Sequence, residues 1–131
     1  MDLVFTEKDD LLKISPGKTI EDVGRFFNSL KYSIIIFESE KCKTKKGLLL
    51  EFKEKLRFPG DFGFNWDALE DSLRNLDYDG QSKKYLLSFK DSVVLAEDVE
   101  GKEILKDILK SASSFLKEKH DIDLKSVFFW N

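Results

Sequence analysis

One stretch of the sequence guides the interpretation of the rest, and it runs Pro59-Gly60-Asp61-Phe62-Gly63-Phe64-Asn65-Trp66-Asp67-Ala68-Leu69-Glu70-Asp71. Proline and glycine at its start interrupt regular structure, and Asn65 belongs to the residue types favoured at a helix N-cap. We therefore expect a loop followed by a helix from about Trp66 to Leu76. Successive helix residues are about 100° apart, which places on one apolar side Trp66, Leu69, Leu73 and Leu76.

The other side of this expected helix carries carboxylates. Asp67, Glu70 and Asp71 fall on an arc turned about 130° from the apolar one. Residues 61–79 contain six acids and a single base, Arg74, in a chain whose net charge is −3. Acids in a first helical turn also interact well with the helix dipole. The charge pattern therefore leaves two interpretations open, a solvated outer face or a surface that binds cations.

Outward from this segment, strand-like and helix-like patterns alternate. Residues 32–37 form a continuous apolar run with three isoleucines, which is typical of a strand buried on both faces. Residues 85–89 and 127–130 predict two further strands, and residues 44–56 and 102–119 predict helices. This alternation predicts an α/β fold in three layers, with a small parallel sheet of about three strands flanked by helices.

The first 31 residues predict an N-terminal extension packed on a main domain of residues 32–131. Residues 3–14 could form a short strand or a hairpin. Thr19 is a plausible N-cap with Asp22 three residues later, which resembles a capping box. Helical spacing then follows at Ile20, Val23, Phe26, Phe27 and Leu30.

Composition limits the class of protein. A chain of 131 residues suits a single hydrophobic core, and 41% apolar with 36% charged residues indicates a globular protein. Cys42 is the only cysteine, no apolar run is long enough to span a membrane, and the start does not resemble a signal peptide. We therefore expect a cytoplasmic protein that contacts no membrane. The negative net charge argues against direct nucleic-acid binding.

Enzyme chemistry finds little support in the sequence. Asp67 and Asp71 lie one helical turn apart and could hold Mg²⁺ or act as an acid–base pair. No nucleophile, Gly-rich phosphate loop or Cys/His cluster accompanies them, and His120 is the only histidine. We therefore expect no catalytic activity, no metal site and no cofactor.

The central segment resembles the signature of the barstar family. The resemblance rests on Phe58-Pro59, on Phe62-Gly63, and on Asn65-Trp66-Asp67-Ala68-Leu69 followed by Asp71 and Leu73. It implies a barstar-like fold and an inhibitor of a cationic ribonuclease or nuclease toxin, bound as a 1:1 complex. The acidic loop and helix would then mimic substrate phosphates in the enzyme's active site. The alternative is a barstar-fold module with a different, regulatory protein target.

The resemblance also assigns roles by position. Asp71 corresponds to the acid that enters the phosphate site, and Asp67 to a second acid on the basic wall of the enzyme. Two positions depart from the pattern, because Asp61 replaces an aromatic contact residue and Glu70 replaces a tryptophan of the family's best-studied inhibitor. The residues expected to contact the partner are Asp61, Phe62, Gly63, Asn65, Asp67, Glu70, Asp71, Tyr78 and Glu118.

Overall fold

The computed structural model describes residues 11–12, 19–76 and 83–129. Its elements, in chain order, are β1 (Leu11–Leu12), α1 (Ile20–Ser29), β2 (Ser33–Ile36), the 3₁₀ helix η2 (Ser39–Cys42), α2 (Lys45–Leu56), α3 (Trp66–Arg74), β3 (Lys84–Lys90), α4 (Val99–His120) and β4 (Asp123–Phe129). Among the described residues, none of these helices combines the length and apolar character needed to cross a membrane.

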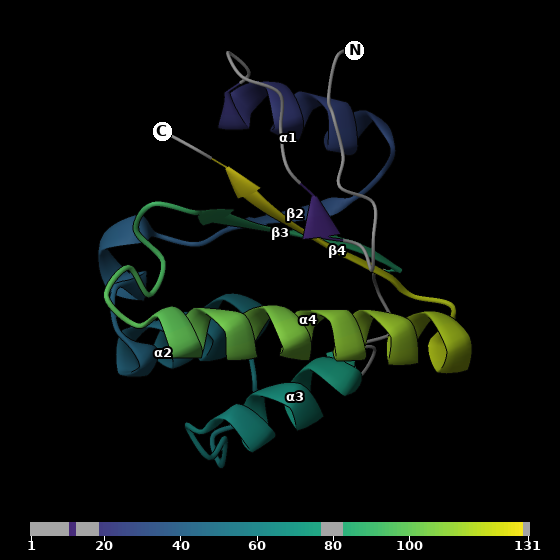
Figure 1. The fold of residues 1–131 in the computed structure, drawn as a ribbon. Helices are drawn as coiled ribbons and strands as arrows, with labels where there is room; N and C mark the ends of the chain where they lie inside the picture. The colour runs from purple at the N-terminus through teal and green to yellow at the C-terminus, as the bar shows by residue number, and fades with distance from the viewer. Residues whose placement is uncertain (1–10, 13–18, 77–82, 130–131) are drawn as a thin grey trace.

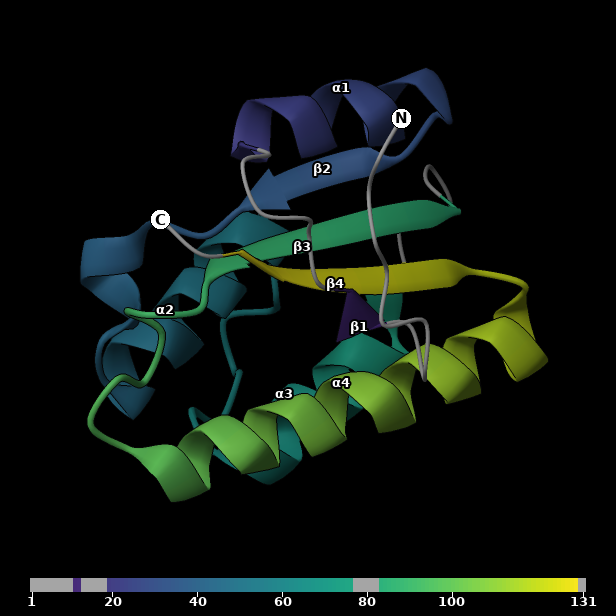
Figure 2. The ribbon, with the colours of Figure 1, turned by 45° about the horizontal axis from the view of Figure 1, so that its top comes forward.

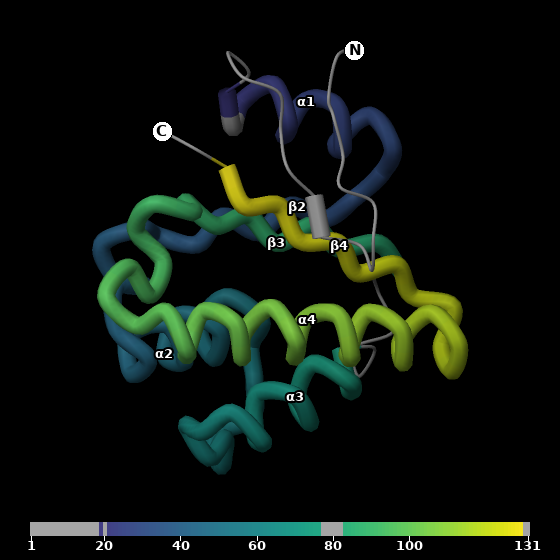
Figure 3. The backbone as a smooth tube through the Cα atoms, viewed as in Figure 1, coloured from purple at the N-terminus to yellow at the C-terminus, as the bar shows by residue number. Residues whose placement is uncertain are grey.

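The strands form one parallel sheet in the order β1-β4-β3-β2. Helix α1 covers one face of this sheet, and α2, α3 and α4 lie on the opposite side (Figures 1 and 2). The tube in Figure 3 shows that α3 lies farther from the sheet than α4 does. The predicted three-layer α/β fold is confirmed, with the two-residue strand β1 added at one edge.

Two apolar clusters fill the space on either side of the sheet. The larger lies between the sheet and α2, α3 and α4, and the smaller joins α1 to β3 and β4 through Val23, Phe27, Leu86 and Val127. Alternate residues of a strand face opposite sides, so Leu86 enters the smaller cluster while Leu87 enters the larger. The central strand β3 is therefore buried on both faces, as predicted.

The N-terminal segment shows the predicted helix start. The Thr19 hydroxyl accepts a hydrogen bond from Asp22 N–H at 3.2 Å, and the Asp22 carboxylate accepts one from Thr19 N–H at 3.0 Å. This reciprocal pair is a capping box, and it confirms the predicted N-terminus of α1. Of the expected strand or hairpin at residues 3–14, only β1 falls within the described residues. The division of the chain at residue 31 stays a prediction.

Residues 32–37 contain the predicted strand, but it is only partly buried, with Ile34 packed against the smaller cluster and Ile35 against the larger. Strand β2 lies at an edge of the sheet, with β3 as its one neighbour, and Ile36 is 52% exposed. The run of isoleucines predicted a strand correctly, but an apolar run does not report where in the sheet its strand lies.

Candidate functional site

The candidate site is built on the loop between α2 and α3. Arg57 ends α2 in the left-handed conformation, with φ 56°, and its N–H donates to Lys53 O. A turn then follows in which Phe62 N–H donates to Pro59 O at 3.0 Å. The rings of Phe58 and Phe62 are both buried, and their centroids lie 5.2 Å apart. Two aromatic side chains thus anchor the loop from inside.

The strained position of this loop is Phe64 rather than a glycine. Gly63 does not adopt positive φ, whereas Phe64 has φ 49°. Positive φ is uncommon for a bulky residue. The Phe64 ring is 42% exposed and lies 5.0 Å from the ring of Phe62. Its residue type gave no signal of this conformation in the sequence.

Asn65 joins the loop to the helix. Its side-chain oxygen accepts a hydrogen bond from Ala68 N–H at 2.7 Å, and its side-chain nitrogen donates to Gly63 O at 3.2 Å. The first bond satisfies a backbone donor at the start of α3, as an N-cap residue should. The second holds the preceding loop in a defined position relative to the helix. Asn65 therefore has a clear structural role, whatever its contact with a partner.

Helix α3 separates an apolar side from an acidic side. Leu69 and Leu73 are fully buried, while Asp67 and Asp71 are exposed, as the helical spacing predicts. Trp66, predicted to be buried, is only half-buried, and Lys45 Nζ of α2 lies 5.1 Å from the centroid of its ring. A tryptophan is large, so complete burial is rare even where it packs against the core.

The single base of the segment is engaged between α3 and α4. Arg74 Nη2 lies 2.7 Å from Glu70 Oε2 and donates to Ser111 Oγ at 2.8 Å. Ser111 Oγ in turn donates to Glu70 Oε2 at 3.0 Å, and the Arg74 guanidinium lies 4.7 Å from the ring centroid of Phe115. These contacts hold Glu70 half-buried at the junction of two helices. Arg74 therefore neutralises Glu70.

Three carboxylates near this bridge have no cationic partner in the part of the chain that the structure describes, and we call Asp61, Asp67 and Asp71 the acidic surface. Within residues 11–12, 19–76 and 83–129, no Lys, Arg or His nitrogen lies within 4.0 Å of their carboxylate oxygens. All three side chains are exposed. The described part of the fold therefore supplies no cationic side chain to any of the three.

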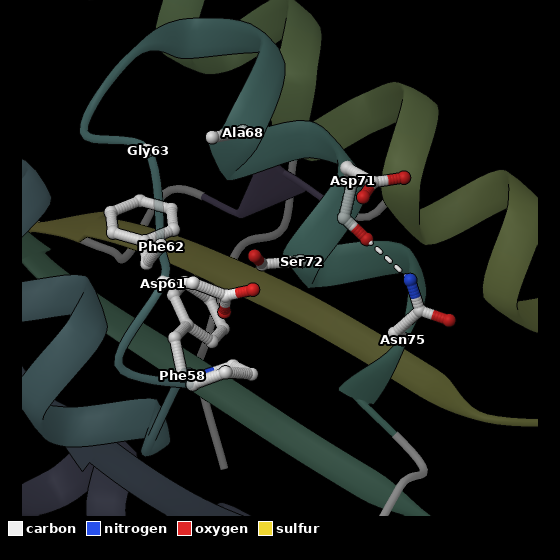
Figure 4. Close-up of a pocket in the computed structure, with 9 residues that line it drawn as sticks. Phe58, Asp61, Phe62, Gly63, Ala68, Asp71, Ser72 and Asn75 are labelled. Carbon is white, nitrogen blue, oxygen red and sulfur yellow. Dashed lines mark hydrogen bonds between the residues drawn. The ribbon is translucent and has the colours of Figure 1, made fainter.

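Two hollows meet at Asp71. A shallow one of about 290 Å³ is lined by Asp67, Glu70, Asp71 and Arg74. A larger cavity of about 510 Å³ lies between the loop and α3 (Figure 4), and its lining is Phe58, Pro59, Asp61, Phe62, Gly63, Ala68, Asp71, Ser72 and Asn75. Asp71 lines both hollows.

The structure brings together most of the residues expected to contact a partner, but not all. Asp61, Phe62, Gly63 and Asp71 share the larger cavity, where Phe62 is a buried wall. Glu118 is exposed in the last turns of α4 and lines neither hollow. Tyr78 lies outside the described residues. The sequence did not reveal that Glu70 bonds Ser111, because that residue is 41 positions away along the chain.

The described residues offer no site for a metal ion. Where the structure describes the chain, it contains no group of three or more His, Cys, Asp or Glu side chains that could hold one. Asp67 and Asp71 therefore face solvent without a third ligand from this part of the chain.

Comparison with protein families gives a match over most of the chain. A family model described as "Barstar (barnase inhibitor)" matches residues 32–127, a range that contains the loop, α3 and the acidic surface. Among curated proteins, no sequence matches the chain.

Proposed function

The chain belongs to the barstar family, and from this premise we propose that it covers the active site of a barnase-type ribonuclease with its acidic surface. Members of this family are inhibitors of such ribonucleases or immunity proteins, and they are not enzymes. We propose a complex with one copy of each protein, formed in the cytoplasm, in which the inhibitor acts as an antitoxin.

The observation that carries this proposal is that the carboxylates of Asp61, Asp67 and Asp71 have no cationic partner among the described residues. A ribonuclease must hold a polyanionic substrate, so cationic side chains line its active site. Carboxylates form short, charge-assisted hydrogen bonds with such cations, as substrate phosphates do. The acidic surface has the charge needed to replace a stretch of RNA backbone there.

The rigidity of helix α3 and of the loop before it also supports the proposal. Helix α3 is fixed by the burial of Leu69 and Leu73 and by the bridge from Arg74 to Ser111. The loop is fixed by the Asn65 side chain and by two buried phenylalanines. Because these groups are ordered before binding, association loses less conformational entropy than it would with a mobile loop.

The direct test uses barnase as the probe and a fluorogenic RNA oligonucleotide as its substrate. We expect barnase activity to fall linearly with added inhibitor and to vanish at one equivalent, with RNA competing for the same site. Binding should weaken as salt is raised, because the attraction between the two surfaces is electrostatic.

A matched control removes a carboxylate from the opposite side of the molecule. Glu21 is exposed in the first turn of α1, on the other face of the sheet. The variant Glu21→Gln should inhibit barnase as the unmodified protein does. If barnase neither binds the protein nor loses activity in its presence, the ribonuclease role is wrong and a different protein target is favoured.

A further inference from the structure

A further hollow of the surface lies between α2 and the loop before α3, and we call it the α2 hollow. Its volume is about 480 Å³. The residues that line it are Lys45, Lys46, Leu49, Leu50 and Phe64. We propose that the α2 hollow binds a segment of a partner protein in which an apolar side chain lies next to carboxylates. No residue of the acidic surface lines this hollow, so the inference goes beyond the proposed function and does not depend on it.

Apolar side chains from two separate segments meet in the α2 hollow. Leu50 of α2 is 45% exposed and Phe64 of the loop is 42% exposed, while the neighbouring Leu49 is buried. Among the described residues, five large apolar side chains are exposed, and two of them line this hollow. An exposed apolar patch with a polar rim is typical of a surface that binds another molecule.

The backbone of Phe64 gives an independent observation. Its φ of 49° lies in a region that is uncommon for a bulky residue and costs conformational free energy. Backbone strain of this kind is concentrated at functional sites, where the surrounding structure maintains it. Phe64 thus lines the α2 hollow at a cost to folding, which points to a role of its ring in binding.

Charge complementarity identifies the occupant as acidic. Lys45 and Lys46 line the hollow, and Lys53 Nζ lies 5.8 Å from the centroid of the Phe64 ring. In the part of the chain that the structure describes, no carboxylate oxygen lies within 4.0 Å of the Nζ atoms of these three lysines. Lys45 and Lys46 also lie in the first turn of α2, where the helix dipole favours acids. Their charge therefore does not stabilise the helix and is available to carboxylates of a partner.

A protein segment fits the α2 hollow better than a nucleic acid does. Bases of a single strand stack on open aromatic rings, but Lys53 Nζ and the ring of Phe62 already lie close to the ring of Phe64. The rest of the apolar lining is aliphatic. Asp61 and Asp67 stand three residues before and three residues after Phe64, and their charges would repel a chain of phosphates.

The test uses the full-length ¹⁵N-labelled protein and three peptide probes, with binding followed by NMR of the backbone amides. N-acetyl-Asp-Phe-Leu-Glu-amide is both acidic and apolar, N-acetyl-Lys-Phe-Leu-Lys-amide reverses the charge, and N-acetyl-Asp-Gly-Gly-Glu-amide removes the apolar side chains. We expect the first probe to bind about tenfold more tightly than either of the others, because only it matches both kinds of lining. Its largest shifts should fall at Lys46, Leu50 and Phe64. Equal affinities of the three probes, or shifts spread evenly over the surface, would overturn the inference.

Three variants locate the binding. Lys46→Gln should weaken binding of the acidic apolar probe about fivefold, the effect of removing one charge about 4 Å from a carboxylate in a water-exposed site. Leu50→Ser should weaken it by about the same factor, through the loss of apolar contact. Lys117→Gln is the matched control and should bind as the unmodified protein does. Lys117 is exposed in the last turn of α4, and that end of α4 lies away from α2 (Figures 1 and 2).

Backbone spectra of the three variants verify that the fold is retained. Unchanged affinity in both Lys46→Gln and Leu50→Ser would contradict the assignment of the site. A fluorescein-labelled oligouridylate tests the other class of occupant. Failure of this RNA to bind, together with binding of the acidic apolar probe, supports the inference. RNA binding that is tighter than peptide binding and is weakened by Lys46→Gln would show that the hollow binds nucleic acid, and the inference would then be wrong.

Discussion

Two helices that flank the same loop carry carboxylates in opposite situations. Glu51 on α2 is only 2% exposed, and its Oε2 accepts a hydrogen bond from the backbone N–H of Glu38 at 2.9 Å. Asp71 on α3 is exposed and lacks a cationic partner among the described residues. The first carboxylate holds the chain after β2 against α2. The second contributes no described side-chain contact to the fold.

This difference indicates where binding chemistry can reside. A buried carboxylate must form hydrogen bonds with the protein around it, so its interactions contribute to the free energy of folding. An exposed carboxylate stays hydrated until a partner replaces the water, so its interaction free energy contributes to binding rather than to folding. Substitutions in the two regions should therefore separate stability from affinity, and the following predictions test that separation.

The largest effect on stability should come from the buried side of α3. Leu69→Ala removes a side chain that is fully buried in the main core. We expect a loss of about 2–5 kcal/mol in the free energy of unfolding, measured by urea denaturation. A change within about 0.5 kcal/mol, which is typical of surface sites, would contradict the assignment of this helix face.

On the opposite side of the same helix, Asp71→Ala should change binding rather than folding. If Asp71 is desolvated against nuclease cations, its removal leaves them unpaired, and affinity should fall by about 2–5 kcal/mol, mostly through faster dissociation. The free energy of unfolding should change by less than about 0.5 kcal/mol. Surface plasmon resonance with barnase measures the first quantity, and urea denaturation measures the second. Unchanged dissociation kinetics would remove Asp71 from the proposed interface.

Glu51→Ala should produce the reverse pattern. It removes the acceptor of Glu38 N–H, and leaving a buried donor unsatisfied costs about 1–3 kcal/mol of stability. Glu51→Gln keeps an acceptor oxygen at this position and should be less destabilising. Dissociation kinetics from barnase should be unaltered in both variants when they are measured below their unfolding temperatures. An affinity loss as large as that of Asp71→Ala would contradict the view that Glu51 serves folding and Asp71 serves binding.

The smallest effect at neutral pH is expected for Cys42. Burial raises the pKa of its thiol to about 12, and the nearby carboxylates of Glu51 and Glu38 add to the shift. The folded protein thus holds this proton more tightly than an unfolded chain, whose thiol pKa is near 9.0. The resulting contribution to stability is complete below about pH 9 and declines as the pH rises toward 12.

Urea denaturation from neutral pH to about pH 10 measures this decline. The unmodified protein should lose stability more steeply above pH 9 than Cys42→Ala does. At neutral pH the native thiol should also react with iodoacetamide more slowly than the thiol of the urea-unfolded chain, because the thiolate is the reactive form. Equal pH slopes in the two proteins would show that the thiol is not buried in solution.

Local signals in the sequence predicted a large part of the fold and of the site. The N-caps at Thr19 and Asn65, the apolar side of α3 and its exposed acids were all predicted from spacing of a few residues. Caps and helix faces depend on neighbours within one or two turns, so the printed sequence contains the information needed. The strand at residues 85–89 and the long helix from Val99 were predicted in type, although their ends were not.

The features that escaped prediction involve contacts between distant segments. The edge position of β2, the positive φ of Phe64, and the bridge from Glu70 through Arg74 to Ser111 have no local pattern. Which acid Arg74 would neutralise could not be deduced from spacing alone. Glu70 and Asp71 lie four and three residues from it, and both spacings allow an ion pair on a helix.

By itself, the sequence determined the type of protein: an α/β domain with a loop and an acidic helix that resemble the barstar signature. Tertiary structure alone decided which acidic side chains remain available to bind a partner. The packing of α3 on α4 places Ser111 and Phe115 beside Arg74, and this directs the guanidinium to Glu70. The turn at Pro59 places Asp61 and Asp71 in one cavity. The physical reason is that helix and cap preferences act over a few residues, whereas pairing of charges depends on which segments the core brings together.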